Sequence, residues 1–371
     1  MLGKTLKRFS GKLLIQGLAN ISGSFALTLI IIVAGNFSIK TDAGAEQSLL
    51  LYGFIVFVCS NWGGLADWIN AGVPSPMFEE KIRRDAIYLA LAAVLLFLVD
   101  LFLYEIRLDI QGIAFWSMCC YLQAVIAGVY KRKNDNIKFM VFSLTSHAMS
   151  LAILFLDLQW PSVFISIILA YCCLAWKEQP ELFRIGGGGG GARETSWHVV
   201  KLGLLNVLAG DLDRYLIAFF VSSVSAVQYI SIATIVGVIA IVIVSLQRFL
   251  VLNVSPQDIV RLSKTASTAH LLVSPVLLGV YVWWISSEFW WIGVGLAFIV
   301  KYYAVIRSAP IVFRLYGNNR LRFAYLLQFR VNLLNAVFFP FYFMLPPTLA
   351  LAAAGKVLSS IPLFRVIKKC E

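Results

Sequence analysis

The sequence is dominated by apolar runs that are each long enough to cross a lipid bilayer. A spanning helix needs about 20 mostly apolar residues, and such runs recur along all 371 residues. They predict twelve spans, at residues 14–37, 49–69, 86–104, 113–130, 137–156, 160–176, 199–221, 227–250, 271–285, 289–305, 323–344 and 349–366. The ninth span is short and is expected to extend toward Ala266. With 60% hydrophobic and 13% charged residues, against about 25% charged in soluble domains, the chain is predicted to be an all-α polytopic membrane protein.

The basic residues predict how the helices are oriented. If twelve spans alternate, nearly all of the 31 Lys and Arg residues fall on one side of the membrane, while Lys40 and Arg107 fall on the other. Because cytoplasmic loops carry an excess of Lys and Arg, both termini are expected in the cytoplasm. The same bias explains the net charge of +12 without nucleic acid as a partner.

A long cytoplasmic loop divides the predicted spans into two sets of six. The loop covers residues 177–198 and contains the glycine run Gly186 to Gly191. No strand–turn–helix pattern surrounds the glycines, so a flexible tether is favoured over a phosphate-binding loop. We therefore expect an N-terminal lobe at 1–176 and a C-terminal lobe at 199–371. An even number of helices in each half would make the lobes parallel repeats.

Three basic residues lie deep within predicted spans, and all belong to the second half: Arg214, Arg330 and Lys356. A charge near the bilayer centre costs about 2.5–3.5 kcal/mol on insertion scales, so such residues usually face a bundle interior or a watery cavity. Their number exceeds that of the nearby acids. This excess predicts an anionic ligand, a phosphate or a carboxylate, held by the three cations.

Two acids accompany Arg214 in the stretch "LLNVLAGDLDRYLIAFFV". Helical geometry places Asp211 and Arg214 on one face, whereas Asp213 points to a different face that it nearly shares with Asn206. We expect Asp211 and Asp213 to tune the cations or to carry a proton. Asn206 joins the candidate site residues through the face that it shares with Asp213.

Simpler explanations stay open for these residues. Asp211 and Arg214 could form an internal pair that only makes a polar helix tolerable, and Arg330 could extend to the cytoplasmic surface. Asp67, in "GGLADWINAG", and Arg248, near the inner end of its span, are further candidates. A solvated helix end would explain Asp67, and a topological charge would explain Arg248.

The sequence contains no motif that indicates an enzyme. GxSxG, HExxH, P-loop and paired-carboxylate patterns are absent, and the three histidines have no metal-ligand spacing. We therefore predict no enzymatic activity, no cofactor and no metal. If the chain moves a substrate, the energy must come from a gradient, from downhill flow or from a partner.

The residues from Asn206 to Leu250 resemble two helices of a known family. Leu212, Asp213 and Arg214, the turn "SSVSA", and Val227-Gln228-Tyr229 are similar to the seventh and eighth helices of O-antigen (Wzx-type) flippases. These belong to the multidrug/oligosaccharidyl-lipid/polysaccharide (MOP) exporter superfamily. Gln228 departs from the family pattern, which has glycine before the tyrosine.

The resemblance implies a fold, a substrate and partners. The two lobes would surround a central cavity, and the protein would flip an undecaprenyl-pyrophosphate-linked oligosaccharide across the bacterial inner membrane by alternating access. Arg214, Arg330 and Lys356 would contact its anionic headgroup. Glycan polymerase and ligase proteins would be further partners, beside the lipid bilayer.

Two other functions are considered from the sequence. A cation-coupled multidrug exporter of the same superfamily would need a cavity dominated by carboxylates, which the cation excess disfavours. A polysaccharide polymerase would carry a large extracytoplasmic loop, and an acyltransferase a membrane-embedded catalytic histidine. Neither feature is evident in this sequence.

Overall fold

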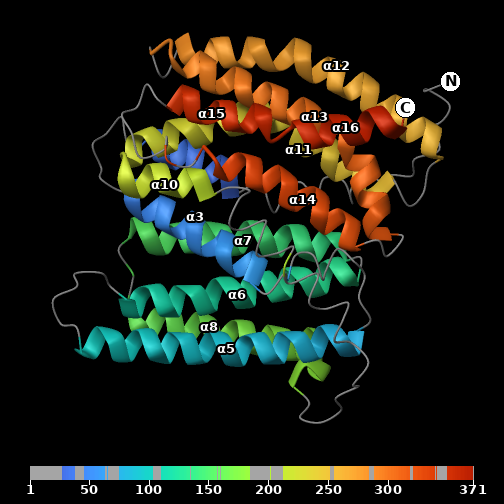
Figure 1. The fold of residues 1–371 in the computed structure, drawn as a ribbon. Coiled ribbons are helices and arrows are strands. Elements are labelled where there is room, and N and C mark those ends of the chain that lie inside the picture. The colour runs from blue at the N-terminus through green and yellow to red at the C-terminus, as the bar shows by residue number, and fades with distance from the viewer. Residues whose placement is uncertain are drawn as a thin grey trace. The chain divides into compact units, whose positions relative to one another are not determined.

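The computed structural model places an all-α chain, and among the residues that it describes there is no strand (Figure 1). It describes residues 27–37, 46–62, 65, 75–102, 110–133, 135–156, 158, 160–183, 201, 212–250, 255–283, 288–317, 321–338, 340 and 349–370. Each of the twelve predicted spans coincides with at least part of a described helix. Among the described residues, five helices are long and apolar enough to cross a membrane by length and composition. Together they indicate a multi-pass membrane protein.

The chain divides into two compact units. Unit 1 contains residues Met1–Leu50 and Leu208–Glu371, and unit 2 contains Leu51–Val207. This division groups the N-terminal helix Leu27–Phe37 with the C-terminal part of the chain, unlike the lobes expected at 1–176 and 199–371. The physical reason is packing, since Ile31 lies in the same buried cluster as Val227. The two six-helix lobes remain a prediction.

Unit 2 is a helical bundle, and the starts of two of its helices are explained by the residues found there. Its elements are most of α3 (Glu46–Asn61), then α5 (Ser75–Phe102), α6 (Ile110–Arg132), α7 (Asn136–Phe155), α8 (Pro161–Glu178) and the 3₁₀ turn η2 (Pro180–Phe183). Asp135 caps α7 by accepting a hydrogen bond from the backbone N–H of Lys138. Pro161 occupies the first position of α8, where its missing N–H costs nothing.

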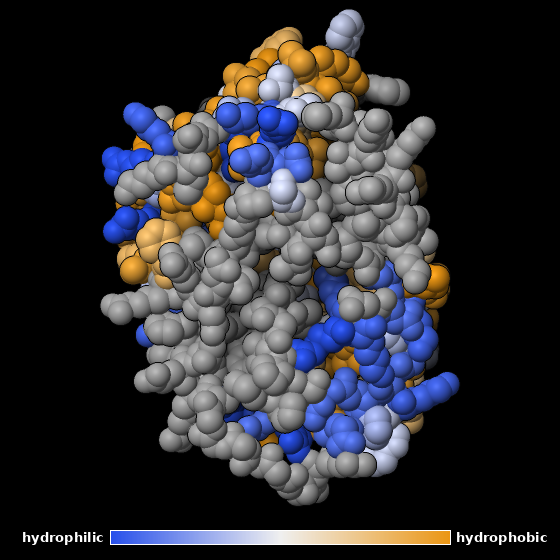
Figure 2. All heavy atoms as spheres, turned by 90° about the vertical axis from the view of Figure 1, so that its right-hand side faces the viewer, coloured by the Kyte–Doolittle hydropathy of each residue, from blue (hydrophilic) through white to orange (hydrophobic). Residues whose placement is uncertain are grey.

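One end of unit 2 is rich in charged contacts. At this end α5 and α7 begin while α6 and α8 end, and Glu178 accepts contacts from both Lys133 and Lys138. Gln179 donates a hydrogen bond to Glu79 at 2.7 Å, and Lys81 pairs with Asp85 one turn later along α5. Figure 2 looks onto these helix ends and shows hydrophilic residues gathered on that face. The sequence predicts this side to be cytoplasmic.

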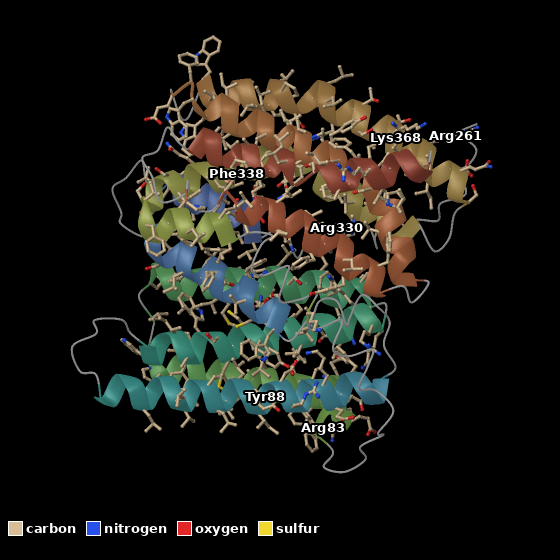
Figure 3. The ribbon with its side chains drawn as sticks, in the orientation of Figure 1. Arg83, Tyr88, Arg261, Arg330, Phe338 and Lys368 are labelled. Atoms are coloured by element: carbon tan, nitrogen blue, oxygen red, sulfur yellow. The ribbon has the colours of Figure 1, made fainter. Side chains whose placement is uncertain are left out.

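Unit 1 contains the remaining helices. After α10 (Leu212–Phe220) come α11 (Ser223–Leu250), α12 (Pro256–Tyr281), α13 (Trp291–Gly317), α14 (Leu321–Ala336), α15 (Leu349–Leu358) and α16 (Ile361–Cys370). Helices α11, α12 and α13 pack against one another, and α13 also packs against α15. Figure 3 shows Arg261 of α12 and Lys368 of α16 toward the same end of this unit.

A proline in α13 explains how three of these helices are joined. Pro310 has no N–H and cannot bond the carbonyl four residues earlier, which belongs to Ile306. That carbonyl instead accepts hydrogen bonds from Ser263 Oγ on α12, at 2.8 Å, and from Gln247 Nε2 on α11, at 3.2 Å. The proline therefore converts a backbone bond into contacts between helices.

The last predicted span, 349–366, is two helices rather than one. Helix α15 ends at Leu358, a turn follows at Ser359 and Ser360, and α16 begins at Ile361. Pro362 at the start of α16 cannot donate to the Leu358 carbonyl, which accounts for the break. The break places Lys356 in the last turn of a helix instead of mid-span.

Candidate functional site

A buried ion pair lies inside unit 1. Lys356 Nζ contacts Asp213 Oδ2 at 2.6 Å, and both side chains are 1% exposed. Asp213 lies in the first turn of α10, whereas Lys356 lies in the last turn of α15. The negative end of the α15 dipole favours a cation at this position. Two segments 143 residues apart in sequence thus meet through opposite charges.

Tyr229 also contacts the carboxylate. Its hydroxyl donates a hydrogen bond to Asp213 Oδ2 at 2.5 Å, from a buried position on α11. The Tyr229 ring packs against Phe298 of α13, with centroids 5.1 Å apart. Asp213 is therefore held by groups from two neighbouring helices, and its orientation is well defined.

Two further cations act on the same carboxylate. Lys301 of α13 and Arg214 of α10 lie close enough for their charges to stabilise the negative charge of Asp213. We call Asp213, Tyr229, Lys301, Lys356 and Arg214 the Asp213 cluster. Among the described residues it combines three cations with one carboxylate, so these groups together carry a net positive charge, although only Asp213 and Lys356 are fully buried.

The structure brings together some of the predicted site residues and separates others. Asp213 and Lys356 are joined directly, and Arg214 lies within electrostatic range of them. Arg330 is instead exposed on α14 and forms no contact with Asp213 that we can describe (Figure 3). Its predicted contact with the headgroup stays a prediction, because an exposed side chain can also line a watery cavity.

The other candidates cannot be placed at the site. Asp211, Asn206 and Asp67 lie outside the described residues, so the expected pair between Asp211 and Arg214 stays a prediction. Arg248 lies near the end of α11, but its side chain is outside the described set.

Lys301 was missed by the sequence reasoning, although a signal was present. It lies ten residues into α13, which begins at Trp291, and thus about 15 Å along the helix axis. The predicted span 289–305 places Lys301 at a cytoplasmic helix end, whereas the unbroken helix to Gly317 places it mid-helix. Tyr229 enters the sequence analysis through the family resemblance only, and its bond to Asp213 has no sequence signal.

Unit 2 contains a buried polar network without charged groups. The Tyr52 hydroxyl contacts His147 Nδ1 at 3.0 Å, and Gln123 Nε2 lies 3.3 Å from the same nitrogen. Gln123 Nε2 also donates to Ser146 Oγ at 2.8 Å. Since an amide nitrogen can only donate, His147 Nδ1 must accept, and the imidazole is held in its neutral form.

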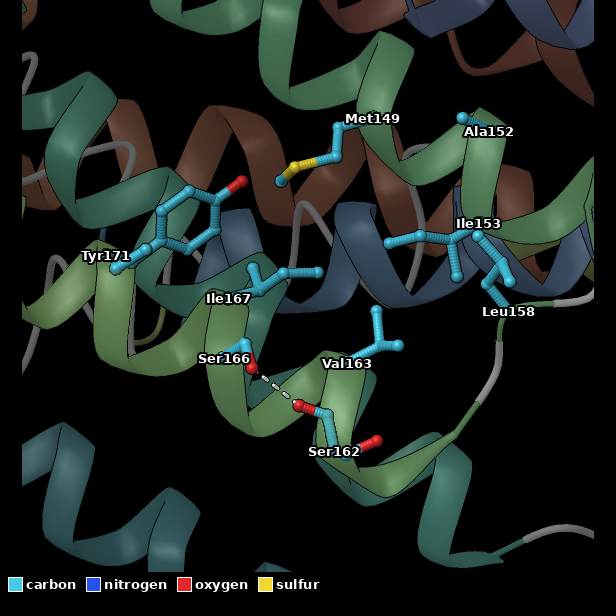
Figure 4. A pocket seen from close by; sticks show the side chains of 10 residues that line it. Met149, Ala152, Ile153, Leu158, Ser162, Val163, Ser166, Ile167 and Tyr171 are labelled. Carbon is cyan, nitrogen blue, oxygen red and sulfur yellow. Dashed lines mark hydrogen bonds between the residues drawn. The ribbon is translucent and has the colours of Figure 1, made fainter.

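Unit 2 also has an apolar pocket between α7 and α8. The pocket has a volume of about 520 Å³, and Met149, Ile153, Val163 and Ile167 are among its lining residues (Figure 4). Its polar lining groups are Ser162, Ser166 and the Tyr171 hydroxyl, and no lining residue is charged. Such a pocket suits an apolar chain and not a charged headgroup. Within the described residues, no cluster of three His, Cys, Asp or Glu side chains could hold a metal ion.

Comparisons with known proteins give a similarity in fold. Neither a protein-family model nor a curated protein sequence matches this chain. A MOP superfamily transporter from Pyrococcus furiosus superposes on 96% of this chain and 95% of its own, with a TM-score of 0.53 and 11% sequence identity. A mutant of the Vibrio cholerae MATE transporter VcmN superposes on 100% of this chain and 97% of its own, with a TM-score of 0.46 and 13% identity. The first similarity shows that this chain has the fold of a MOP superfamily transporter.

Proposed function

We propose that this chain is a membrane transporter that flips an undecaprenyl-pyrophosphate-linked oligosaccharide across the bacterial inner membrane by alternating access. The observation that carries the proposal is the Asp213 cluster, with three cations around one carboxylate inside unit 1. The fold similarity to a MOP superfamily transporter supports it. Because charged groups inside a membrane are costly and mark functional sites, a function that uses the Asp213 cluster explains it better than packing does.

The Asp213 cluster suits a pyrophosphate for electrostatic reasons. Pyrophosphate oxygens are strong acceptors that can replace Asp213 as partners of Lys356, and Arg214 can bind two of them at once. In this proposal Asp213 holds Lys356 in place until the headgroup arrives. The break after Leu358 then lets α15 and α16 adjust separately, which a continuous helix would not allow.

The polarity of a binding pocket can differ between proteins of this fold. The Pyrococcus furiosus transporter is described with a pocket of reversed polarity, which suggests a different function for it. A cation-coupled exporter of cationic drugs would need acidic groups in excess around its substrate. The net positive charge of the Asp213 cluster therefore favours an anionic substrate in this chain.

Lipid binding tests the headgroup part of the proposal. We would measure binding of undecaprenyl pyrophosphate, undecaprenyl phosphate and undecaprenol to the purified protein by native mass spectrometry. Affinity is expected to fall in that order, and Lys301→Gln or Arg214→Gln is expected to weaken pyrophosphate binding about tenfold, as for loss of one charge-assisted bond. Equal binding of all three lipids would contradict the proposal.

Arg330 offers a matched control and a test of its own predicted role. It is a cation of unit 1 whose side chain is exposed, and no contact among the described residues joins it to the Asp213 cluster. Arg330→Gln should therefore leave pyrophosphate binding nearly unchanged. Complementation of a flippase-deficient strain, scored as glycan on the cell surface, would then show whether Arg214→Gln loses transport while Arg330→Gln keeps it. If Arg330→Gln loses transport at a normal protein level, Arg330 belongs to the substrate site after all.

A further inference from the structure

A second buried polar group lies at the junction of α11, α12 and α13, away from the contacts of the Asp213 cluster. His270 of α12 is 0% exposed, and its Nε2 lies 3.0 Å from the carbonyl oxygen of Ile299 on α13. Its Nδ1 lies 2.8 Å from Ser274 Oγ, and that hydroxyl lies 2.9 Å from the carbonyl oxygen of Val236 on α11. One imidazole and one hydroxyl thus connect three helices.

The hydrogens in this chain of contacts can be assigned from donor chemistry. A carbonyl only accepts, so His270 Nε2 carries a hydrogen in every state. When the imidazole is neutral, Nδ1 has a lone pair and the Ser274 hydroxyl can donate to it. When the imidazole is protonated, Nδ1–H donates to Ser274 Oγ, and the hydroxyl turns to donate to the Val236 carbonyl. Both states satisfy every polar atom of the two side chains.

We propose that His270 and Ser274 form a proton-binding site whose occupied and empty states differ by the rotation of one hydroxyl. No heavy atom has to move for the proton to be accepted, because acceptors for all three hydrogens are already in place. The ligand is a proton, and in the transporter proposed above it would be the driving ion. That role rests on the proposed function, whereas proton binding itself does not.

The groups near the imidazole come from α11, α12 and α13. From α13, the Tyr302 ring lies with its centroid 6.3 Å from that of His270 and the two planes 87° to each other. From α11, the contact is the Val236 carbonyl. On α12 itself Lys264 is exposed, and on α13 Lys301 lies over Phe298, 5.9 Å from its centroid.

The site is also placed to influence the Asp213 cluster. His270 bonds to Ile299, and Lys301 follows two residues later on the same helix. Tyr302 packs so tightly on α11 that a side-chain carbon on Gly237 would lie 2.7 Å from its ring. A change in hydrogen bonding at His270 would therefore act on α13 close to Lys301, whose charge acts on Asp213.

His147 of unit 2 provides an internal control. It is also buried, but its Nδ1 faces the Gln123 amide nitrogen, which can only donate. A proton on His147 Nδ1 would therefore oppose the Gln123 N–H. The two histidines should behave differently under the same conditions.

The proposal is tested by nuclear magnetic resonance of the full chain, with ¹⁵N-labelled histidine, in lipid nanodiscs between about pH 4 and pH 8. Single His→Gln variants assign the signals. We expect His270 to change from one protonated nitrogen to two as pH falls, while His147 keeps one. Ser274→Ala should weaken proton binding at His270 roughly tenfold, because an imidazolium bond is stronger than a neutral one.

Ser274→Thr keeps the hydroxyl and should titrate like the original protein, which covers the case in which Ser274→Ala does not fold. A His270 that stays neutral throughout, or that titrates alike in Ser274→Ala, would overturn the proposal. A vesicle assay separates the roles: His270→Gln should bind undecaprenyl pyrophosphate normally but lose the increase in transport caused by a pH gradient. If the original protein does not bind that lipid, the proposed function fails while the titration of His270 still stands.

Discussion

Unit 1 and unit 2 both bury polar side chains, and each buries an ion pair, but the surroundings of the two pairs differ. In unit 2, the network of Tyr52, Gln123 and His147 is neutral, and the buried pair Lys81–Asp85 lies toward a helix end. In unit 1, Asp213 and Lys356 are charged, fully buried and surrounded by further cations. Since neutral networks satisfy packing at lower cost, the charges of unit 1 support the ligand site proposed there.

The largest effect should come from removing the acid of the Asp213 cluster. Asp213→Asn leaves three cations facing one another, and we expect about 5 kcal/mol of destabilisation, the upper end for breaking a buried pair. Lys356→Met should cost less, because Lys301 and Arg214 still act on the carboxylate. Thermal unfolding of the purified variants in one detergent measures the order. The reverse order would contradict the proposed charge balance.

A smaller effect is expected at the charged end of unit 2. Lys81 and Asp85, which precede the predicted span 86–104, are both buried, and burial lowers the pKa of Lys81 and raises the pKa of Asp85. Lys81→Met should destabilise by about 3 kcal/mol because Asp85 is left without its cation. The double variant Lys81→Met with Asp85→Leu should recover most of this loss. If it does not, the pair has a role beyond mutual neutralisation.

The position of the N-terminal helix can be tested by overpacking. A side-chain carbon on Gly35 would lie 2.8 Å from Val227 Cγ1, so Gly35→Ala should cost about 2 kcal/mol. Gly279→Ala is the matched control, because nothing lies within 4 Å of the added carbon. Denaturation midpoints of both variants compare them. Equal midpoints would argue against grouping residues 27–37 with unit 1.

The neutral network of unit 2 should respond least. Tyr52→Phe removes one hydrogen bond to His147 Nδ1, yet Gln123 still contacts that nitrogen. We expect a loss of about 1 kcal/mol and no change in lipid binding. Thermal unfolding and pyrophosphate binding of Tyr52→Phe are measured as for the variants of the Asp213 cluster. A loss of lipid binding would extend the ligand chemistry to unit 2.

Much of the helical fold could be predicted, because the bilayer fixes the length of an apolar run. The prediction of 113–130 lies within α6 (Ile110–Arg132), and 160–176 nearly coincides with α8. Helix α12 begins at Pro256, earlier than the predicted 271. Polar residues before that position hide this part of the helix from a search for apolar runs. Ser263 and His270 are such residues, and both find partners on α13.

The site could be predicted only in part. The cost of charge in a membrane pointed to Asp213, Arg214 and Lys356, but not to the contact between α10 and α15, since pairing across the sequence leaves no periodic signal. Asp211 lies outside the described residues, so the expectation that it tunes Arg214 stays a prediction. For Arg330 the sequence predicts the depth along the helix but not the exposure of the side chain, because depth says nothing about which face of the helix the residue occupies.

The exchange of bonds at Pro310 has a consequence for how this sequence can evolve. While proline is present, Gln247 and Ser263 supply the partners of the Ile306 carbonyl. If a mutation replaced the proline, the restored N–H could bond that carbonyl, and the carbonyl would no longer depend on the two side chains for a donor. The same change at Gln247 or Ser263 would then be harmful in one background and harmless in the other. Substitutions at these three positions should therefore be tolerated in some orders and rejected in others, a historical dependence that no single variant reveals.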